Sequence, residues 1–249
     1  MKRKGFTLVE LLIVVAIIAL LMSILMPILS KVKRHASAAV CMHNLKTLSR
    51  GWFMYKDAND DKLVGGHVGG PPNWVRGPSG PSSDPIEQKK EGIRQGLLFE
   101  YVGKSVDVYR CPSDGRKLTP GQAAFRSYSI AGGLNGEGWQ NTYVQAKVYG
   151  DIKNPAGKYV FVEESDPRGW NVGSWVLNPK TKTWVDPLAI WHHRKSTLGF
   201  ADGHAEARKW VDESTIEMSE KQIFYHPVPV GEGEDIDFML RGFPYKSLQ

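Results

Sequence analysis

Cysteine is scarce in this chain, and acidic residues are scarce near its start. Two cysteines among 249 residues exclude a small scaffold held by many disulfides and allow at most one bridge within the chain. Residues 1–50 contain eight basic residues and one acid, Glu10, whereas the rest of the chain is nearly neutral. Without a basic domain to follow a phosphate backbone, we expect no nucleic-acid partner.

Enzyme motifs are also absent. The sequence has no Gly-x-Ser-x-Gly motif, no phosphate-binding P-loop and no His-Glu-x-x-His motif. Glu163 and Glu164 end a predicted strand, where successive side chains face opposite sides and do not line one site. Asp166 is close enough in sequence to pair with one of them, but nothing specifies the geometry of an acid–base pair. We therefore expect no catalytic residue and no enzyme.

Charge is missing altogether from Leu11 to Ser30. As a helix, these residues span about 30 Å, which matches the hydrocarbon thickness of a bilayer. A helix without a polar face does not suit the surface of a soluble protein. The sequence therefore predicts one membrane-spanning helix.

Two other uses of this apolar segment remain as alternatives. Residues 36–38, Ala-Ser-Ala, have the form of a signal-peptidase site, but they follow a basic cluster at 31–34 where such a site is neutral. A lipoprotein anchor on Cys41 is the second, although Val40 is bulky for the position before such a cysteine. Basic residues flank both ends of the segment, so the positive-inside rule alone does not orient it.

Glu10 lies at the edge of the apolar segment, where a carboxylate is costly in lipid and normally has a partner. One explanation is that the Glu10 carboxylate lies in the headgroup layer of the membrane. Another requires a nearby cation, which a new N-terminal amine would supply after a cut behind Gly5. The segment Lys-Gly-Phe-Thr-Leu-Val-Glu from Lys4 to Glu10, followed by the apolar run, resembles the signal of type IV prepilins and type II secretion pseudopilins.

This resemblance implies cleavage between Gly5 and Phe6 by a prepilin peptidase, followed by N-methylation of Phe6. It implies that Glu10 pairs with the Phe6 amine of a neighbouring subunit in a filament. Pro27 falls where many pilins kink their N-terminal helix, because proline removes a backbone hydrogen bond. The implied partners are the peptidase, other pilin or pseudopilin subunits and the inner membrane.

The same resemblance divides the chain into three parts. Residues 1–5 form a cytoplasmic leader, and residues 6–30 form the transmembrane helix and assembly segment. Residues 31–249 form an extracytoplasmic, periplasmic α+β domain. The protein would cross the inner membrane once.

The residues beyond the apolar run predict an α+β fold. A helical face of apolar residues comprises Ala38, Cys41, Leu45, Leu48, Trp52 and Tyr55. The helix should end near residues 57–61 and lie on an antiparallel sheet, which is also the pilin fold. We expect a strand at 158–163, a hairpin across Asn178-Pro179 and a second hairpin with a type I′ turn at Asp202-Gly203. Residues 65–85 read as a loop, 86–102 as a helix, and the chain after Val211 as mostly irregular.

A second resemblance lies near the C-terminus. His192, nine intervening residues and Asp202-Gly203 resemble the H-X9-DG signature of prepilin-type processing-associated proteins, which are large pseudopilin-like proteins. The segments that begin at Cys41 and surround Cys111 also resemble that group. The resemblance implies a fold and a compartment more than an activity.

Cys41 and Cys111 are candidates for a disulfide, which a non-cytoplasmic compartment permits. The closed loop of about 70 residues corresponds to a stabilisation of about 4 kcal/mol in the chain-entropy account. The alternative is two free thiols, with Cys41 as a small core residue on its helical face.

Metal ligands are available but loosely spaced. His192, His193, Asp202 and His204 fit no known zinc spacing, and an Asx turn accounts for Asp202. His192 would then bond the backbone or Asp202 and hold the loop, so we assign no metal there. Residues 57–61 resemble the opening of a calcium loop but lack the glycine and the distal glutamate. A calcium site therefore remains an alternative to which we assign no residues, and we name no cofactor.

Aromatic residues near glycine and proline are the last feature. Six tryptophans lie in loops or predicted hairpins: Trp74, Trp139, Trp170, Trp175, Trp184 and Trp191. Large aromatics mostly pack in cores, although an exposed set would form a ligand surface. The sequence therefore favours a pilin or pseudopilin subunit of a type II secretion or type IV pilus-like system. The alternative is a membrane-anchored extracytoplasmic carbohydrate- or metal-binding protein or hydrolase.

Overall fold

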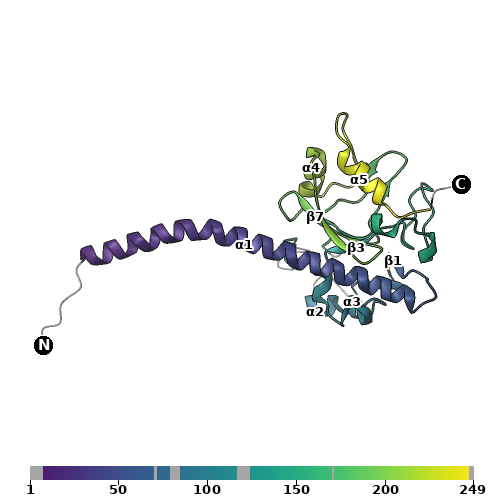
Figure 1. The fold of residues 1–249 in the computed structure, drawn as a ribbon, viewed down its shortest axis with the longest axis horizontal. Coiled ribbons are helices and arrows are strands. Elements are labelled where there is room, and N and C mark those ends of the chain that lie inside the picture. Colours follow the sequence, from purple (N-terminus) through teal and green to yellow (C-terminus); the bar gives the residue numbers. More distant parts are fainter. Residues whose placement is uncertain (1–7, 70–71, 79–84, 117–123, 170, 247–249) are drawn as a thin grey trace.

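The computed structural model describes residues 8–69, 72–78, 85–116, 124–169 and 171–246. Its dominant element is α1, one helix of 50 residues from Leu8 to Asp57. Figure 1 shows the first half of α1 projecting away from the molecule, while its second half lies along a body of strands and short helices. A long N-terminal helix followed by antiparallel sheets confirms the predicted α+β, pilin-like fold class.

The other elements are short. A four-stranded antiparallel sheet runs in the order β3 (Tyr128–Ile130), β4 (Tyr159–Glu163), β7 (Lys195–Phe200) and β8 (Ala205–Lys209). A three-stranded antiparallel sheet contains β5 (Leu177–Asn178), β6 (Thr183–Trp184) and β9 (His226–Pro227), and a parallel pair contains β1 (Gly65–Val68) and β2 (Asn73–Val75). The remaining α-helices are α2 (Ile86–Lys89), α3 (Glu91–Arg94), α4 (Glu213–Lys221) and α5 (Glu234–Gly242). The 3-10 turns are η1 (Phe99–Val102), η2 (Asp107–Tyr109), η3 (Tyr149–Asp151) and η4 (Pro155–Gly157).

The first half of α1 exposes its apolar side chains on every side. Exposure ranges from 81% at Leu8 to 46% at Val14, and it continues as far as Leu29. The helix passes through Pro27 without a break, and Figure 1 shows α1 as one gently curved helix. This half therefore offers an apolar surface that no other part of the described chain covers.

The second half of α1 packs against β4, β7 and β8. The predicted apolar face is confirmed, because Cys41, Leu45, Leu48 and Trp52 are at most 1% exposed. The helix approaches the sheet so closely that a Cβ atom at Gly199 of β7 would lie 2.3 Å from the Ser49 hydroxyl oxygen. Only glycine fits β7 at this point of contact.

Both predicted hairpins are present, with one correction. β5 pairs with β6, and β7 pairs with β8, in antiparallel register. The Gly203 amide donates to the Phe200 carbonyl and the Phe200 amide donates to the His204 carbonyl, while Gly203 alone in the loop has a positive φ, of 89°. This is a three-residue loop, with a type I turn followed by a left-handed glycine, and not the predicted type I′ turn.

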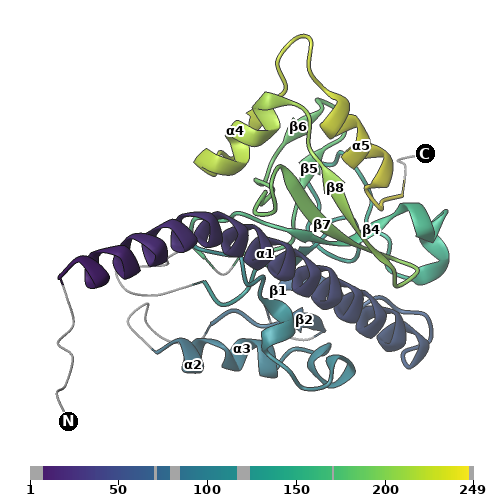
Figure 2. The same ribbon diagram turned by 60° about the vertical axis from the view of Figure 1, so that its left-hand side comes forward.

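The expected loop at 65–85 and helix at 86–102 are wrong in detail. The first contains the strands β1 and β2, and the second divides into α2, α3 and η1. The helical conformation is interrupted at Gly96, where a Cβ atom would lie 2.0 Å from the Trp74 carbonyl oxygen. The Leu97 amide donates to the Asn73 carbonyl at 3.2 Å, so tertiary contact with β2 replaces the helical hydrogen bond. Figure 2 shows β1, β2, α2 and α3 together beside α1.

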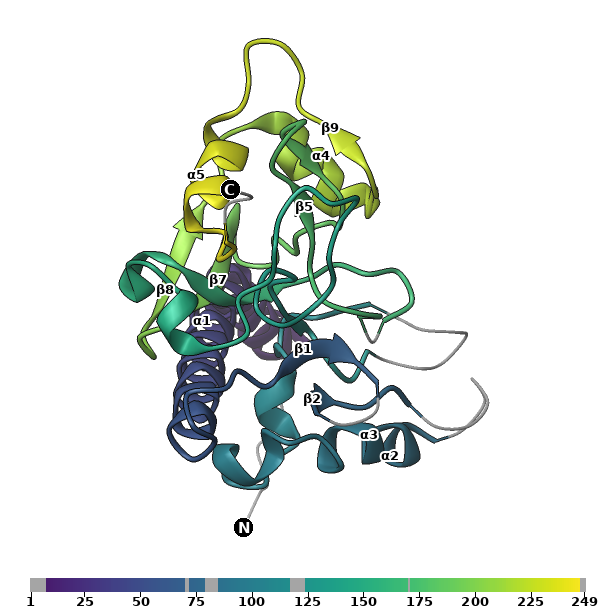
Figure 3. The ribbon, with the colours of Figure 1, turned by 90° about the vertical axis from the view of Figure 1, so that its right-hand side faces the viewer.

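The chain after Val211 also differs from the irregular tail that the sequence predicts. It forms α4 and α5, which cover the side of the main sheet opposite α1 in Figure 3. Ile236, Met239 and Phe243 are almost fully buried, and they recur at the three- and four-residue spacing of one helical face. They pack with Trp175, Trp184 and Trp210 in a second core. The sheet is thus covered by helices on both faces.

Replacing Leu48 with alanine should destabilise the domain by about 2–5 kcal/mol, because it leaves a cavity between α1 and the sheet. The matched control is Leu21→Ala on the exposed half of the same helix, where the side chain is 61% exposed. Urea unfolding of the full chain in detergent, followed by tryptophan fluorescence, measures both changes. Equal stability of the two variants would contradict the packing described above.

Candidate functional site

The N-terminal half of α1 is the first candidate functional segment. It is the one helix in the described chain that is long and apolar enough to cross a membrane, with a mean hydropathy of 3.0 over 18 residues that are 0% buried. Glu10 lies in the first turn of this helix. Gly5 and Phe6, the expected processing residues, lie outside the described residues, as does the rest of the leader.

The second candidate lies where α1 enters the folded domain. Cys41, the first fully buried residue of α1, forms a disulfide with Cys111, and their Cα atoms are 5.3 Å apart. The Asn44 side chain, one helical turn further on, donates to the Arg110 carbonyl at 3.0 Å. The Cys111 amide donates to the Ser127 hydroxyl at 3.0 Å. A covalent bond and a separate hydrogen bond therefore hold the Cys111 segment against α1.

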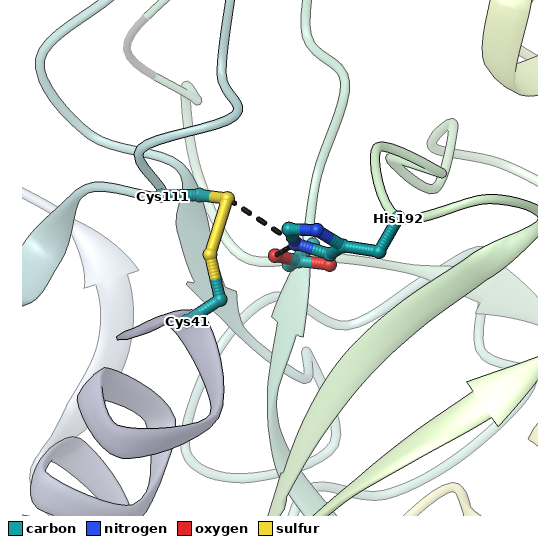
Figure 4. A group of neighbouring side chains, drawn as sticks. Cys41, Cys111 and His192 are labelled. Carbon is teal, nitrogen blue, oxygen red and sulfur yellow. Dashed lines mark hydrogen bonds and ion pairs between the residues drawn. A yellow bond between two sulfur atoms is a disulfide. The ribbon is translucent and has the colours of Figure 1, made fainter. Parts of the chain in front are cut away.

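His192 and Glu163 complete this cluster. Figure 4 shows the imidazole of His192 pointing at the disulfide. Its Nε2 atom lies 3.4 Å from Cys111 Sγ and 3.2 Å from Glu163 Oε1. The other Glu163 oxygen accepts the Thr197 amide at 2.9 Å. The four side chains come from α1, the loop after η2, the end of β4 and the loop before β7, and all are buried.

The residues of the H-X9-DG pattern lie at opposite ends of one strand. His192 precedes β7, whereas Asp202 and Gly203 form the turn that follows it, so about 20 Å of strand separates them. Asp202 Oδ1 contacts His204 Nδ1 at 2.5 Å, and the His204 ring stacks on Phe200. Of the two partners expected for His192, the backbone or Asp202, Asp202 is therefore wrong. The His192 side chain bonds Glu163, and its backbone amide donates to the Lys195 carbonyl at 3.2 Å.

The separation also decides which histidines share a site. His193 and His204 do not join His192 in the cluster; the described residues whose ligand atoms converge there are Cys41, Cys111 and Glu163. Sequence reasoning paired Cys41 with Cys111, and separately it named His192 and placed Glu163 on a strand. It missed their convergence, because four segments that are distant in sequence meet only after α1 docks on the sheet.

A second buried polar group was not predicted from the sequence as a group, although Glu164 and Asp166 were named. Asp114 and Arg116 form an ion pair at 2.7 Å, and both side chains are nearly buried. Arg116 also donates to the Asp166 carbonyl at 2.8 Å, while the fully buried Arg126 donates to the Tyr128 carbonyl at 2.7 Å. No spacing in the sequence marks this group, because it forms only where the segment before β3 meets the segment after β4.

Glu164 belongs to this group and faces away from Glu163, as alternation along a strand predicts. It accepts a short hydrogen bond from the Ser129 hydroxyl. Burial, with a smaller contribution from Asp166, raises the pKa of Glu164 to about 7. Burial also lowers the pKa of Arg126 to about 10. Asp166 itself is held by Arg168 at 2.6 Å, so these groups form an internal network of charges that joins the segment before β3 to the segment after β4.

The tryptophans mostly pack in the interior. Trp74, Trp175 and Trp184 are 0% exposed, which supports a core role over a ligand surface. Trp139 is partly exposed and lies against Tyr225, and Trp191 is partly exposed under the Arg116 guanidinium. Trp170 lies outside the described residues.

The calcium-like segment at residues 57–61 forms the end of α1. Lys56 contacts the carboxylates of Asp57 at 2.5 Å and Asp61 at 3.2 Å. The side-chain Nδ2 of Asn59 donates to the Tyr55 carbonyl at 2.7 Å. These polar side chains therefore stabilise the C-terminal end of α1. This agrees with the interpretation of the segment as a solvated helix terminus.

The pH dependence of stability tests the buried network. The pKa of Glu164 rises from its ordinary 4.5 to about 7, so the folded state binds more protons between these values and stability falls as the pH rises through them. Glutamine cannot ionise. Between about pH 5 and about pH 8, Glu164→Gln should therefore gain up to about 3 kcal/mol in stability relative to wild type. Urea titrations measure the difference, with the exposed Glu206→Gln as control. A difference that does not vary with pH would contradict this assignment.

The N-terminus matches a known family model. The prokaryotic N-terminal methylation motif matches residues 1–26, which include Gly5, Phe6, Glu10 and much of the apolar run. No curated protein and no solved structure gives a significant match. The motif, together with the long apolar helix and the antiparallel sheet, supports a prepilin-type, pilin- or pseudopilin-like protein that is anchored in a membrane through one N-terminal helix.

Proposed function

We propose that this chain is a non-enzymatic pilin or pseudopilin subunit of a type II secretion or type IV pilus-like system. A prepilin peptidase cuts it after Gly5 and methylates the new amine of Phe6. The mature chain then assembles through the first half of α1, with the α+β domain in the periplasm.

The exposed apolar half of α1 is the observation that carries this proposal. An 18-residue window of that helix is 0% buried within the chain, and the soluble half of the same helix is already packed on the sheet. Backbone groups in a helix satisfy one another, so the segment is stable in lipid or among other helices. The apolar half of α1 is not covered by its own domain. It can therefore lie in a bilayer and later pack against the same helix of other subunits.

Glu10 provides the register of assembly. It is the acid in the first turn of α1, and the next twenty residues, Leu11 to Ser30, carry no charge. A carboxylate at this depth favours a cationic partner. The amine of Phe6 on a neighbouring subunit pairs with the Glu10 carboxylate at one relative position of the two helices along the filament axis. A single ion pair therefore selects the position of each added subunit.

The topology follows from the same processing. The leader of residues 1–5 stays in the cytoplasm, and residues 31–249 lie outside it. The Cys41–Cys111 disulfide supports this placement, because disulfides persist in the periplasm and are rare in the cytosol.

One observation favours the alternative of a membrane-anchored metal-binding protein. Cys41, Cys111, Glu163 and His192 present ligand atoms that converge in a buried position. Such a site is compatible with a filament subunit, because it lies in the folded domain and not in the apolar half of α1. The buried tryptophans give no comparable support to carbohydrate binding.

Mass spectrometry of the mature N-terminus tests the processing. In a host with a prepilin peptidase, we expect a chain that begins with N-methylated Phe6. A Gly5→Val variant should keep its leader, because the cut requires a small residue before it. An intact Met1 in the wild type, or a start near Ala39, would make α1 a plain anchor or signal and overturn the proposal.

Glu10→Ala should leave cleavage intact but reduce assembled subunits by about tenfold or more, equivalent to a loss of about 1.4 kcal/mol or more per contact. Quantitative blotting of sheared filaments against the membrane fraction measures assembly, and the mature mass reports cleavage. Glu100→Ala is the matched control, since Glu100 lies in η1 outside the apolar segment. Assembly of the Glu10 variant at the wild-type level would refute the register mechanism.

A further inference from the structure

The buried cluster at the entry of α1 has the composition of a metal site. Cys41, Cys111, Glu163 and His192 each offer one ligand atom, and these atoms lie within 4.8 Å of one another. The two sulfur-bearing side chains and Glu163 are 0% exposed, and His192 is 7% exposed. Within the described chain, this is the position at which a group of such side chains converges.

We propose that the reduced, dithiol form of this cluster binds one zinc ion, and that the disulfide is its metal-free, oxidised form. The ligands are Sγ of Cys41 and Cys111, Nε2 of His192 and Oε1 of Glu163. Two thiolates, an imidazole and a carboxylate form a donor set that zinc accepts in tetrahedral geometry. This inference is independent of filament assembly.

The distances already approach those of a tetrahedral site. With zinc bonds of about 2.0–2.3 Å, neighbouring ligand atoms lie about 3.3–3.8 Å apart. His192 Nε2 lies 3.4 Å from Cys111 Sγ and 3.2 Å from Glu163 Oε1. The two sulfur atoms have to separate, which rotation about the Cα–Cβ bonds of the cysteines allows, and all four ligand atoms start within 4.8 Å of one another.

Neighbouring groups hold the ligands in place without the disulfide. The Thr197 amide binds one Glu163 oxygen at 2.9 Å and leaves Oε1 directed at His192. The Asn44 side chain binds the Arg110 carbonyl at 3.0 Å, so Cys111 stays next to α1 after the sulfur bond breaks. Outer contacts of this kind orient metal ligands and raise affinity.

The electron and proton balance is simple. A dithiol reductant supplies two electrons and two protons, the S–S bond breaks, two protein thiols form, and the reductant becomes a disulfide. Zinc then replaces the two thiol protons, which leave to solvent. The divalent ion offsets most of the negative charge of two thiolates and one carboxylate, which would otherwise be costly in a buried position.

A cavity of about 290 Å³ adjoins the cluster. It lies between α1 and the β7–β8 hairpin, and its lining includes Met42, His192 and Thr197. His192 is therefore the cluster residue that an ion in the cavity meets first, whereas Cys41, Cys111 and Glu163 are 0% exposed and are not part of the lining.

The full chain in detergent tests the proposal. It is reduced with dithiothreitol, desalted without oxygen, supplied with one equivalent of zinc, desalted again and measured by elemental analysis. We expect about one zinc per reduced chain and none in the oxidised chain. Cobalt in place of zinc should give thiolate-to-cobalt charge-transfer absorption and the visible bands of a tetrahedral ion.

Variants assign the ligands. His192→Ala and Glu163→Gln should each weaken zinc binding at least tenfold, whereas His204→Ala, at the other end of β7, should not change it. Quantitative formation of the Cys41–Cys111 disulfide on reoxidation checks that each variant folds. Reduced wild type that stays free of zinc, or zinc affinity that is unchanged in both ligand variants, would overturn the proposal.

Discussion

The packing of the second half of α1 on the main sheet is the contact on which the rest of the structure depends. It requires Leu45, Leu48 and Trp52 on one helical face and a glycine, Gly199, on the facing strand. The contact buries one face of a helix whose first part carries an exposed apolar run as far as Leu29. One element therefore has to satisfy two environments, and the change between them occurs at Cys41.

That boundary is also where the chemistry of the domain is concentrated. The disulfide joins α1 to the loop after η2, and His192 and Glu163 bring in the central strands β7 and β4. The His192 end of β7 thus lies at the helix entry, while the Asp202-Gly203 turn lies near Arg50, further along α1. The two ends of the H-X9-DG pattern have separate structural roles: the histidine belongs to the cluster, and the Asp-Gly pair shapes a turn.

Much of the fold was predictable, because its signals are local. The apolar run, the helical face from Cys41 to Tyr55 and the two hairpins follow from periodicity and turn residues. The break at Gly96 was not predictable, since it depends on the backbone of Trp74. Convergence of Glu163 on His192 and the internal charges around Arg126 were equally invisible, because they arise from contacts between distant segments. The helix α5 was missed although Ile236, Met239 and Phe243 carry its spacing, since acidic residues interrupt the pattern.

The continuity of α1 has a mechanical consequence. Because the helix runs unbroken from Leu8 to Asp57, a tensile force applied to its membrane half passes along the helix axis into the domain. The first contact that resists this force is the disulfide at Cys41. Beyond it, the side chains of α1 that pack on the sheet resist sliding of the helix along the strands. Elongation under tension would thus be confined to the exposed part of the helix, and the domain would move as a rigid body.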